Sequence, residues 1–358
     1  MRVFLTGRFD CESEFTCLSP AEIEEICAEE AEIKGRGEKA EGKGISARRR
    51  KLAKNSSRLL FEDEAGRWNM KDVVSQAQKD AAFMESRGIR WVSIVEDVYP
   101  SLLREIYDPP AVLFYRGELP PPAADSVAIV GTRKAGAAAL RWAYTTAKDL
   151  SKAGVVVVSG LALGIDAMAH RGCVDAASAV DGGGFYSGGG VETGVAPAAA
   201  VLGSSVDEVY PASNRALARR IVGSGGVLLS EYPPGTLPAK WRFPARNRII
   251  SGLCKCAVVV EAGEKSGALI TASFALEQGR DLFVAGRAGG GAAEGGAGGD
   301  AGGGFYSEGG ATGGGSAEES AGRDAACAFG AGARRLAEEG AKVVYNSGDI
   351  LAELTGRN

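Results

Sequence analysis

A short basic and aromatic stretch offers the clearest chemistry in this sequence. Cationic side chains bind phosphate oxygens, and aromatic rings stack on bases whatever the base. Pro244 favours a helix start here, because the first helical turn does not need the N–H that proline lacks. The stretch predicts a nucleic-acid backbone site at a helix N-terminus, although a solvated surface helix has a similar composition. Its polar, cationic and aromatic residues are Lys240, Trp241, Arg242, Phe243, Arg246, Asn247 and Arg248.

Three further segments carry residue types suited to anion binding. Each is also compatible with an ordinary strand-to-helix turn. Glycine lets a backbone approach phosphate closely, arginine can grip two oxygens, and successive N–H groups can cradle an anion. A Lys-Ser-Gly turn ahead of a helix would place phosphate at the positive end of the helix dipole. The full P-loop pattern is missing, so we interpret that turn as a phosphate contact and not an ATPase site. The candidates are Gly131, Thr132, Arg133, Ser159, Gly160, Gly164, Lys265, Ser266 and Gly267.

Two glutamates leave a hydrolytic alternative open. Glu231 and Glu261 each follow a predicted strand and could lie near each other, as paired carboxylates do in glycosidic-bond hydrolysis. The enzyme alternative is a Rossmann-like phosphoribohydrolase that removes ribose 5-phosphate from nucleotides, but the PGGxGTxxE loop of that family is absent. His170, the single histidine, is expected to be structural, and Asp166 is expected to cap a helix N-terminus.

Composition limits the classes of protein that remain. With 358 residues the chain can form one large domain and a smaller one, and its net charge of −4 excludes a wholly basic nucleic-acid coat. Any DNA site must therefore be a local patch. No apolar run reaches the roughly 18–20 residues of a membrane helix, and no signal-peptide pattern begins the chain. Seven irregularly spaced cysteines indicate reduced thiols in a cytoplasm.

Short apolar segments alternate with helical segments from residue 126 onward, which is typical of a parallel sheet covered on both faces. Ligands collect at the carboxyl ends of the strands in such sheets. We predict an α/β fold with a doubly wound, mostly parallel, extended Rossmann-like sheet. The predicted strands are 127–130, 155–158, 199–202, 227–229, 257–260 and 282–284. The predicted helices are 137–152, 165–176, 214–222, 246–253 and 269–278.

Other parts of the chain depart from this pattern. Residues 1–85 predict a helical but poorly defined N-terminal region, with one amphipathic helix at 70–87. Residues 86–122 form a lead-in with a strand at 89–95 and a stiff proline connector, and residues 123–358 form the core. Glycine-rich inserts at 181–195 and 286–330 share the string Gly-Gly-Gly-Phe-Tyr-Ser. Such chain buries few side chains, so we expect flexible surface loops.

Several consecutive motifs resemble the DprA (Smf) DNA-processing family. The resemblance rests on SEYPPGT at 230–236, FPARNRIISGL at 243–253 and VVVEAGEKSGALITA at 258–272, with support from GTR at 131–133 and SGLALGID at 159–166. It departs from the family pattern at Thr132 and Ala268, where relatives commonly have serine. Many relatives also carry a C-terminal winged helix, which this chain is expected to lack.

The resemblance implies a cytoplasmic, Rossmann-like protein, usually a homodimer, that binds single-stranded DNA. It also implies a role in loading a RecA-type recombinase during natural transformation. Phosphate contacts would come from Arg133, Lys240, Arg246 and Lys265, and Phe243 would stack on or wedge against a base. No turnover, metal or cofactor is expected.

Overall fold

The computed structural model describes residues 70–179, 195–287 and 327–356. The chain divides into two compact units, residues 1–88 and 89–358. The described part of the first unit is helix α3 (Met70–Ser86), close to the helix predicted at 70–87. The expectations for residues 1–69, and for the glycine-rich inserts over residues 181–194 and 288–326, lie outside the described residues.

One nine-stranded sheet forms the second unit, in the order β1-β2-β6-β5-β4-β3-β7-β8-β9. Every parallel strand is short and rich in Val or Ala, and those at the centre are buried on both faces, as expected for strands covered by helices on two sides. The parallel strands are β3 (Ser126–Val130), β4 (Val156–Ser159), β5 (Ala198–Val201), β6 (Val227–Ser230), β7 (Cys256–Val259), β8 (Asp281–Ala285) and β9 (Lys342–Val344).

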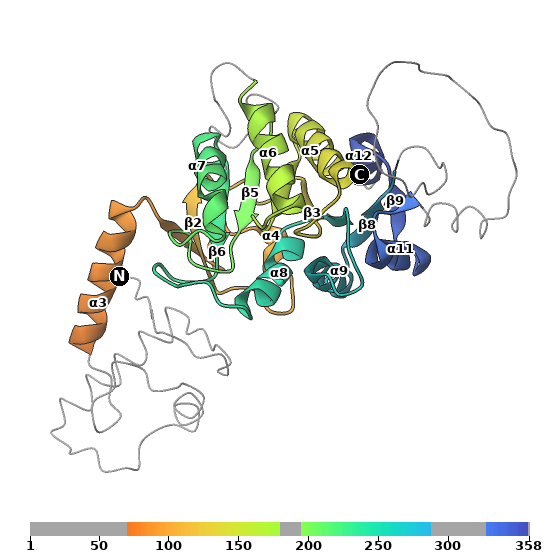
Figure 1. Cartoon of the computed structure of the whole chain (residues 1–358). Coiled ribbons are helices and arrows are strands. Elements are labelled where there is room, and N and C mark those ends of the chain that lie inside the picture. The colour runs from red at the N-terminus through yellow and green to blue at the C-terminus, as the bar shows by residue number, and fades with distance from the viewer. Residues whose placement is uncertain (1–69, 180–194, 288–326, 357–358) are drawn as a thin grey trace, which may run out of the picture. The chain divides into compact units, whose positions relative to one another are not determined.

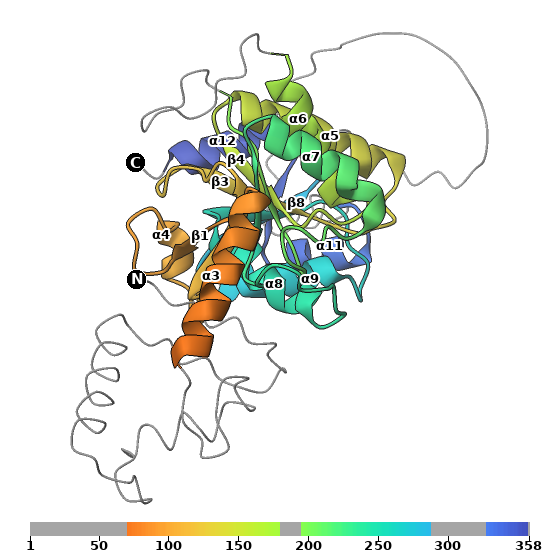
Figure 2. The same cartoon turned by 90° about the vertical axis from the view of Figure 1, so that its left-hand side faces the viewer.

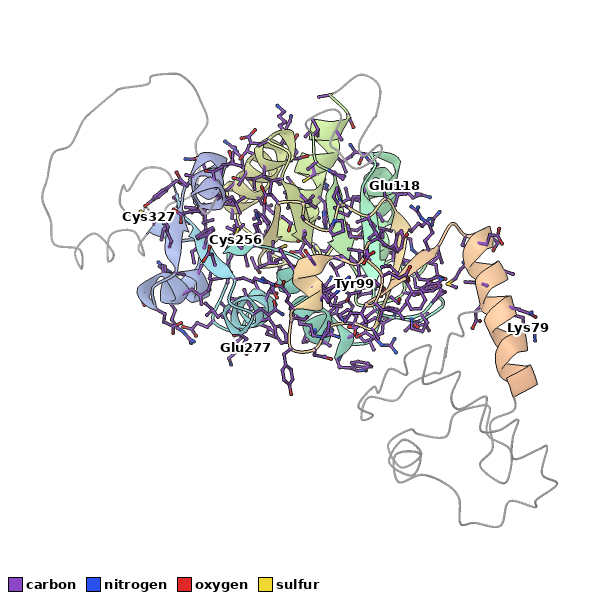
Figure 3. The ribbon with its side chains drawn as sticks, turned by 180° about the vertical axis from the view of Figure 1, so that it is seen from behind. Lys79, Tyr99, Glu118, Cys256, Glu277 and Cys327 are labelled. Atoms are coloured by element: carbon purple, nitrogen blue, oxygen red, sulfur yellow. The ribbon has the colours of Figure 1, made fainter. Side chains whose placement is uncertain are left out.

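An antiparallel hairpin-like pair extends one edge of this sheet. β1 (Arg90–Ser93) pairs with β2 (Val112–Gly117), and β2 pairs antiparallel with β6. The sequence predicted β1 but not β2. Between them, the buried Tyr99 donates a hydrogen bond from its hydroxyl to the Pro110 carbonyl at 2.7 Å, and its position is labelled in Figure 3. The segment 90–117 is therefore continuous with the sheet of the core.

Helices cover both faces of the sheet, as Figures 1 and 2 show. This arrangement confirms the predicted doubly wound α/β fold. None of the described helices is long and apolar enough to cross a membrane. One face carries α5 (Ala137–Lys152), α6 (Ile165–Ala177), α7 (Arg215–Gly223), which follows the short 3-10 helix η1 (Ala212–Asn214), and α12 (Ser347–Thr355). The opposite face carries α4 (Ser101–Arg104), α8 (Arg242–Gly252), α9 (Gly267–Glu277) and α11 (Ala331–Glu338).

The strand order reverses between β3 and β7. From β3 the chain builds outward through β4, β5 and β6, and it then returns so that β7 pairs on the other side of β3. The connections after β3 and β7 therefore leave toward opposite faces of the sheet. In open α/β sheets, ligands bind in the crevice between two such connections. Figure 3 labels Cys256, the first residue of β7, which lies at the end of the strand opposite to the connection after β7.

Helix α8 begins earlier than the sequence predicted. It starts at Arg242 instead of residue 246, so Pro244 is its third residue and still lies within the first turn, where its missing N–H leaves no bond unmade. Ile249 and Ile250 are almost fully buried and hold the helix against the sheet.

The ends of the long glycine-rich insert are joined to each other and to the core. The Arg287 N–H donates to the Cys327 carbonyl at 2.9 Å, and Gly286 forms a bridge with Ala328. Phe329 bridges in turn to Glu261, just after β7. The chain on both sides of residues 288–326 is therefore held at one place beside β8.

Candidate nucleic-acid interface

Glu261 joins the two connections that leave the reversal point. Its carbonyl accepts a hydrogen bond from the Thr132 N–H at 2.7 Å, and its carboxylate Oε2 accepts one from the Gly136 N–H at 3.0 Å, just ahead of α5. This side chain therefore satisfies a donor at a helix N-terminus. These two bonds join the loop after β3 to the loop after β7.

The loop after β4 packs directly on the loop after β3. A side chain at Gly131 would come within 2.5 Å of Ile165, and one at Gly164 within 2.4 Å of the Thr132 carbonyl. Gly164 also has a φ of +77°, which favours glycine. The Ile165 N–H donates to the Thr132 carbonyl at 3.3 Å. In this structure the two predicted phosphate-binding glycines allow close packing between loops.

The predicted anion cradle after β4 already holds a carboxylate of the protein. Asp166 Oδ2 accepts hydrogen bonds from the N–H groups of Gly160 at 3.1 Å and Ala162 at 3.4 Å. Asp166 was expected to be a helix N-cap. That expectation was wrong: Gly164 is the N-cap and Asp166 lies in the first turn, from which it reaches back to the loop. Burial raises the pKa of Asp166, while Arg246 and the two N–H donors oppose that shift.

Further hydrogen bonds, from Ser159 and Asn214, hold the loop after β4. Ser159 is fully buried, and its hydroxyl donates to the Ile129 carbonyl at 2.6 Å. Leu161 has a positive φ of 54°, a conformation that is costly for a residue with a side chain. The Asn214 amide supports it by donating to the Leu161 carbonyl at 2.9 Å and the Ala162 carbonyl at 3.2 Å.

Arg246 lies beneath this loop and not on the surface. It is 4% exposed, and its Nη1 donates to the Gly160 carbonyl at 2.9 Å and to the Val201 carbonyl. Burial lowers its pKa to about 10, an effect that Asp166 opposes and Arg133 reinforces. Arg246 is therefore still a cation at neutral pH. In this conformation its charge supports the loop from inside.

His170 is buried one helical turn after Asp166. Neither of its ring nitrogens makes a hydrogen bond, and burial lowers its pKa to about 3. The imidazole is therefore neutral at physiological pH. This buried environment agrees with the structural role expected from the sequence.

Arg133 and Phe243 meet at the surface. The guanidinium carbon of the exposed Arg133 lies 5.8 Å from the centre of the Phe243 ring. The half-buried ring also contacts the ring of Tyr210, with centres 5.5 Å apart, and it lies against Gly203, where a Cβ would come within 2.8 Å. The start of α8 thus contacts the loops after β3 and β5. Sequence reasoning missed Tyr210, for which no motif gave a signal.

The remaining candidates on α8 and α9 divide into exposed cations and connecting groups. Lys240 and Lys265 are exposed, and no hydrogen bond or ion pair holds either one within the described part of the protein. Ser266 is the N-cap of α9 and accepts from the Ala268 N–H at 3.3 Å, which leaves its own O–H able to donate. The Asn247 amide donates to the Gly267 carbonyl at 3.3 Å and so links α8 to α9.

Arg248 is bound to acidic side chains. Its Nη1 and Nη2 donate to the two carboxylate oxygens of Glu231 at 2.8 and 2.7 Å, and its Nε donates to Asp108 at 3.0 Å. The Arg248 and Glu231 side chains are only 13% and 18% exposed. Burial alone would lower the pKa of Arg248, but the bond to Glu231 raises it above its usual value. This pair joins α8 to the end of β6.

The two glutamates considered for hydrolysis do not form a pair. Glu231 follows β6 and Glu261 follows β7, and β5, β4 and β3 lie between these strands. Neighbouring strands are about 4.8 Å apart, so the two positions are separated by roughly 19 Å across the sheet. Each carboxylate is also bonded elsewhere, Glu231 to Arg248 and Glu261 to the Gly136 N–H. The expectation that they could lie together was wrong.

Comparison with known sequences agrees with the fold. The model of the DNA recombination-mediator protein A family matches residues 90–297. DNA processing protein DprA of Bacillus subtilis is 41% identical over 204 residues, which cover 57% of this chain and 62% of that protein. Protein Smf of Escherichia coli is 39% identical over 187 residues, covering 52% of this chain and 45% of that protein. The matches thus span less than two thirds of these relatives.

Solved structures show the same architecture. The X-ray structure of DprA from Streptococcus pneumoniae aligns with 85% of this chain and 89% of that chain, at 31% identity and a TM-score of 0.55. DNA processing protein A from Helicobacter pylori aligns with 75% of this chain and 96% of that chain, at 23% identity and a TM-score of 0.51. The family match covers more than half of the sequence and all of the candidate site residues. This chain therefore belongs to the DNA recombination-mediator protein A family.

Proposed function

We propose that this protein binds single-stranded DNA at the carboxyl edge of its sheet. The observation that carries the proposal is the contact between the Arg133 guanidinium and the Phe243 ring at 5.8 Å. A cation from the loop after β3 and an aromatic face from the start of α8 offer one backbone contact and one stacking contact side by side. Single-strand binders combine these two features, because every base has a face that can stack.

Exposed cations continue this surface. Lys240 precedes α8 and Lys265 precedes α9, so both lie at the same edge of the sheet as Arg133. The N-terminus of α9, with the Ser266 hydroxyl and the Gly267 N–H, adds donors suited to a phosphate oxygen. On an acidic chain such a local patch determines where a polyanion binds.

The other candidates support this surface from within. Arg246, Gly160, Gly164 and Ser159 hold the loop after β4, and Arg248 and Asn247 hold α8 against its neighbours. Their contribution to DNA binding is the placement of Arg133 and Phe243. We propose no turnover, because the two glutamates of the phosphoribohydrolase alternative lie on distant strands and are bonded within the protein.

The relatives support a role in DNA processing. The Helicobacter pylori protein binds single-stranded DNA, and the Bacillus subtilis relative is a DNA processing protein. The family description names a recombination mediator. We therefore extend the proposal to a cytoplasmic homodimer that delivers single-stranded DNA to a RecA-type recombinase.

Titration with matched single-stranded and double-stranded oligonucleotides tests the binding proposal. We expect tighter binding of oligo-dT than of the duplex, and an affinity that falls steeply as salt increases, since phosphate contacts release counterions. Equal affinity for both, or binding that ignores salt, would overturn the proposal. The proposed partner is tested by measuring how a RecA-type recombinase assembles filaments on single-stranded DNA in the presence and in the absence of this protein.

A further inference from the structure

The loop between β6 and α8 carries a second aromatic cluster, apart from the one at Phe243. Trp241 is 45% exposed, and its ring meets the ring of Tyr232 edge to face, with centres 6.2 Å apart at 87°. The Arg242 guanidinium carbon lies 4.9 Å from the centre of the Tyr232 ring and 5.0 Å from that of Trp241. One side of the indole is therefore packed, and a large part of it is open to solvent.

This cluster is held rigidly. Arg242 donates a hydrogen bond to the Leu237 carbonyl, five residues earlier in the chain. The loop is also fixed to its neighbour after β5, because the Ser205 N–H donates to the Thr236 carbonyl at 3.0 Å and the Gly235 N–H donates to Asp207 at 3.1 Å. An aromatic ring fixed in advance loses little conformational entropy when a ligand stacks on it.

The position of the indole points to a nucleobase as its ligand. Trp241 directly follows the exposed Lys240 and lies two residues before Phe243 at the start of α8. Successive helical residues are turned by about 100°, so these two aromatic side chains point in different directions. Phe243 accordingly contacts the loop after β5, while Trp241 contacts the loop after β6. The exposed Lys240 directly precedes Trp241 in the chain.

We propose that Trp241 is a second base-stacking position, which receives an unpaired base next to the one at Phe243 while Lys240 binds the phosphate beside it. This inference rests on the proposed single-strand binding and adds a binding position to it. The cation against the ring and the exposed lysine favour a stacked base beside a phosphate, and stacking tolerates any base because every base has a face.

The test compares oligo-dT with an abasic oligonucleotide of the same length, which keeps the phosphates and lacks the bases. We expect Trp241→Ala to weaken oligo-dT binding by about 5- to 150-fold, the range for one base–aromatic stack, and to leave abasic binding nearly unchanged. Trp241→Phe keeps a stacking face and should retain most of the affinity. Leu276→Ala is the matched control, because Leu276 is 58% exposed but lies near the C-terminal end of α9, away from the loops.

Tryptophan fluorescence gives a second readout. Oligo-dT should quench an emission component that Trp241→Phe lacks, whereas the buried Trp142 should report no contact. Unchanged oligo-dT affinity in Trp241→Ala, or an equal loss for oligo-dT and the abasic strand, would overturn the stacking role; the former would leave the exposed indole as a contact for another protein. If the unaltered protein binds neither oligonucleotide, the proposed function itself fails.

Discussion

The Arg246 guanidinium donates a hydrogen bond to the carbonyl oxygen of Gly160 at 2.9 Å. This bond joins helix α8 to the loop after β4, two segments 86 residues apart in the chain. Asp166 holds the N–H of the same glycine from the other side. Gly160 is thus fixed between a cation and an anion. These two bonds hold the loop after β4, which packs against Thr132, in its conformation.

Gly160→Ala should destabilise the protein. The added Cβ would lie 2.5 Å from Arg246 Nη2 and 2.7 Å from Asp166 Oδ2, so the buried charged groups would have to move. Forcing an extra carbon into a packed interior costs about 1–3 kcal/mol, which thermal or denaturant unfolding would measure. Gly263→Ala is the control, because a Cβ there would meet nothing within 4 Å. Equal stability of the two variants would contradict the close packing of Gly160 between Arg246 and Asp166.

Arg246→Lys separates support of the loop from direct contact with DNA. Lysine keeps the charge but cannot make the same two carbonyl bonds, so oligo-dT affinity should fall by a similar factor at every salt concentration. The slope of log affinity against log salt should stay the same, since no phosphate contact is lost. A slope flattened by about 0.7 would instead show that Arg246 itself reaches a phosphate.

Arg133→Ala should have the opposite signature. Removing an exposed cation that contacts a phosphate should reduce the steepness of the salt dependence by about 0.7 in a log–log plot for single strands. The melting temperature should hardly change, because the Arg133 side chain is exposed. Lys240→Ala should behave in the same way. Lys152→Ala, an exposed cation at the far end of α5, should leave both quantities unaltered.

Glu231→Gln should mainly reduce stability. It removes the charge from a largely buried carboxylate that binds both terminal nitrogens of Arg248, and breaking such a pair costs roughly 3 kcal/mol. Urea unfolding would measure this loss. Glu339→Gln, which breaks an exposed pair with Arg335 one helical turn away, should cost no more than about 0.5 kcal/mol. Similar losses for the two would show that burial of the Glu231 pair is unimportant.

His170 should make the protein less stable in mild acid. Burial holds its pKa at about 3 in the folded state, whereas an exposed histidine titrates near 6.5. Between these values the unfolded chain binds a proton that the folded protein does not, so stability falls as pH decreases, by up to about 1.4 kcal/mol per pH unit. Asp166, whose pKa is raised by burial, acts in the opposite direction.

The variant His170→Leu isolates this contribution, since the imidazole makes no hydrogen bond that leucine would leave unmade. Urea unfolding at several pH values between about 4 and 7 should show a weaker loss of stability in acid for the variant than for the unaltered protein. Parallel curves for the two proteins would mean that the folded state also protonates His170 in this range.

The sequence predicted most of the parallel core, because each central strand is a short apolar run. Helix α5 was predicted at the residues where it occurs, and β3, β4 and β7 were predicted to within a residue. The strand β2 was not among the predicted strands, although Val112–Gly117 begins with a short apolar and aromatic run.

The sequence identified which residues the loops after the strands carry, but not which of them are exposed and which are bonded within the protein. Arg133, Arg246 and Arg248 are the same residue type in similar motifs, yet one is exposed, one binds Gly160 and one binds Glu231. Those partners depend on which loops the strand order brings together. The separation of Glu231 from Glu261 depends on the strand order as well. The strands β6 and β7, which are consecutive in the chain, are four places apart in the sheet.

The bond between Arg287 and Cys327 makes the segment between them a tolerant place for engineering. Because both flanks are already held beside β8, an insertion between them would leave β8 and β9 in register. A fluorophore or an affinity tag inserted among residues 288–326 would therefore give a labelled protein whose Arg133–Phe243 surface is left intact for binding assays.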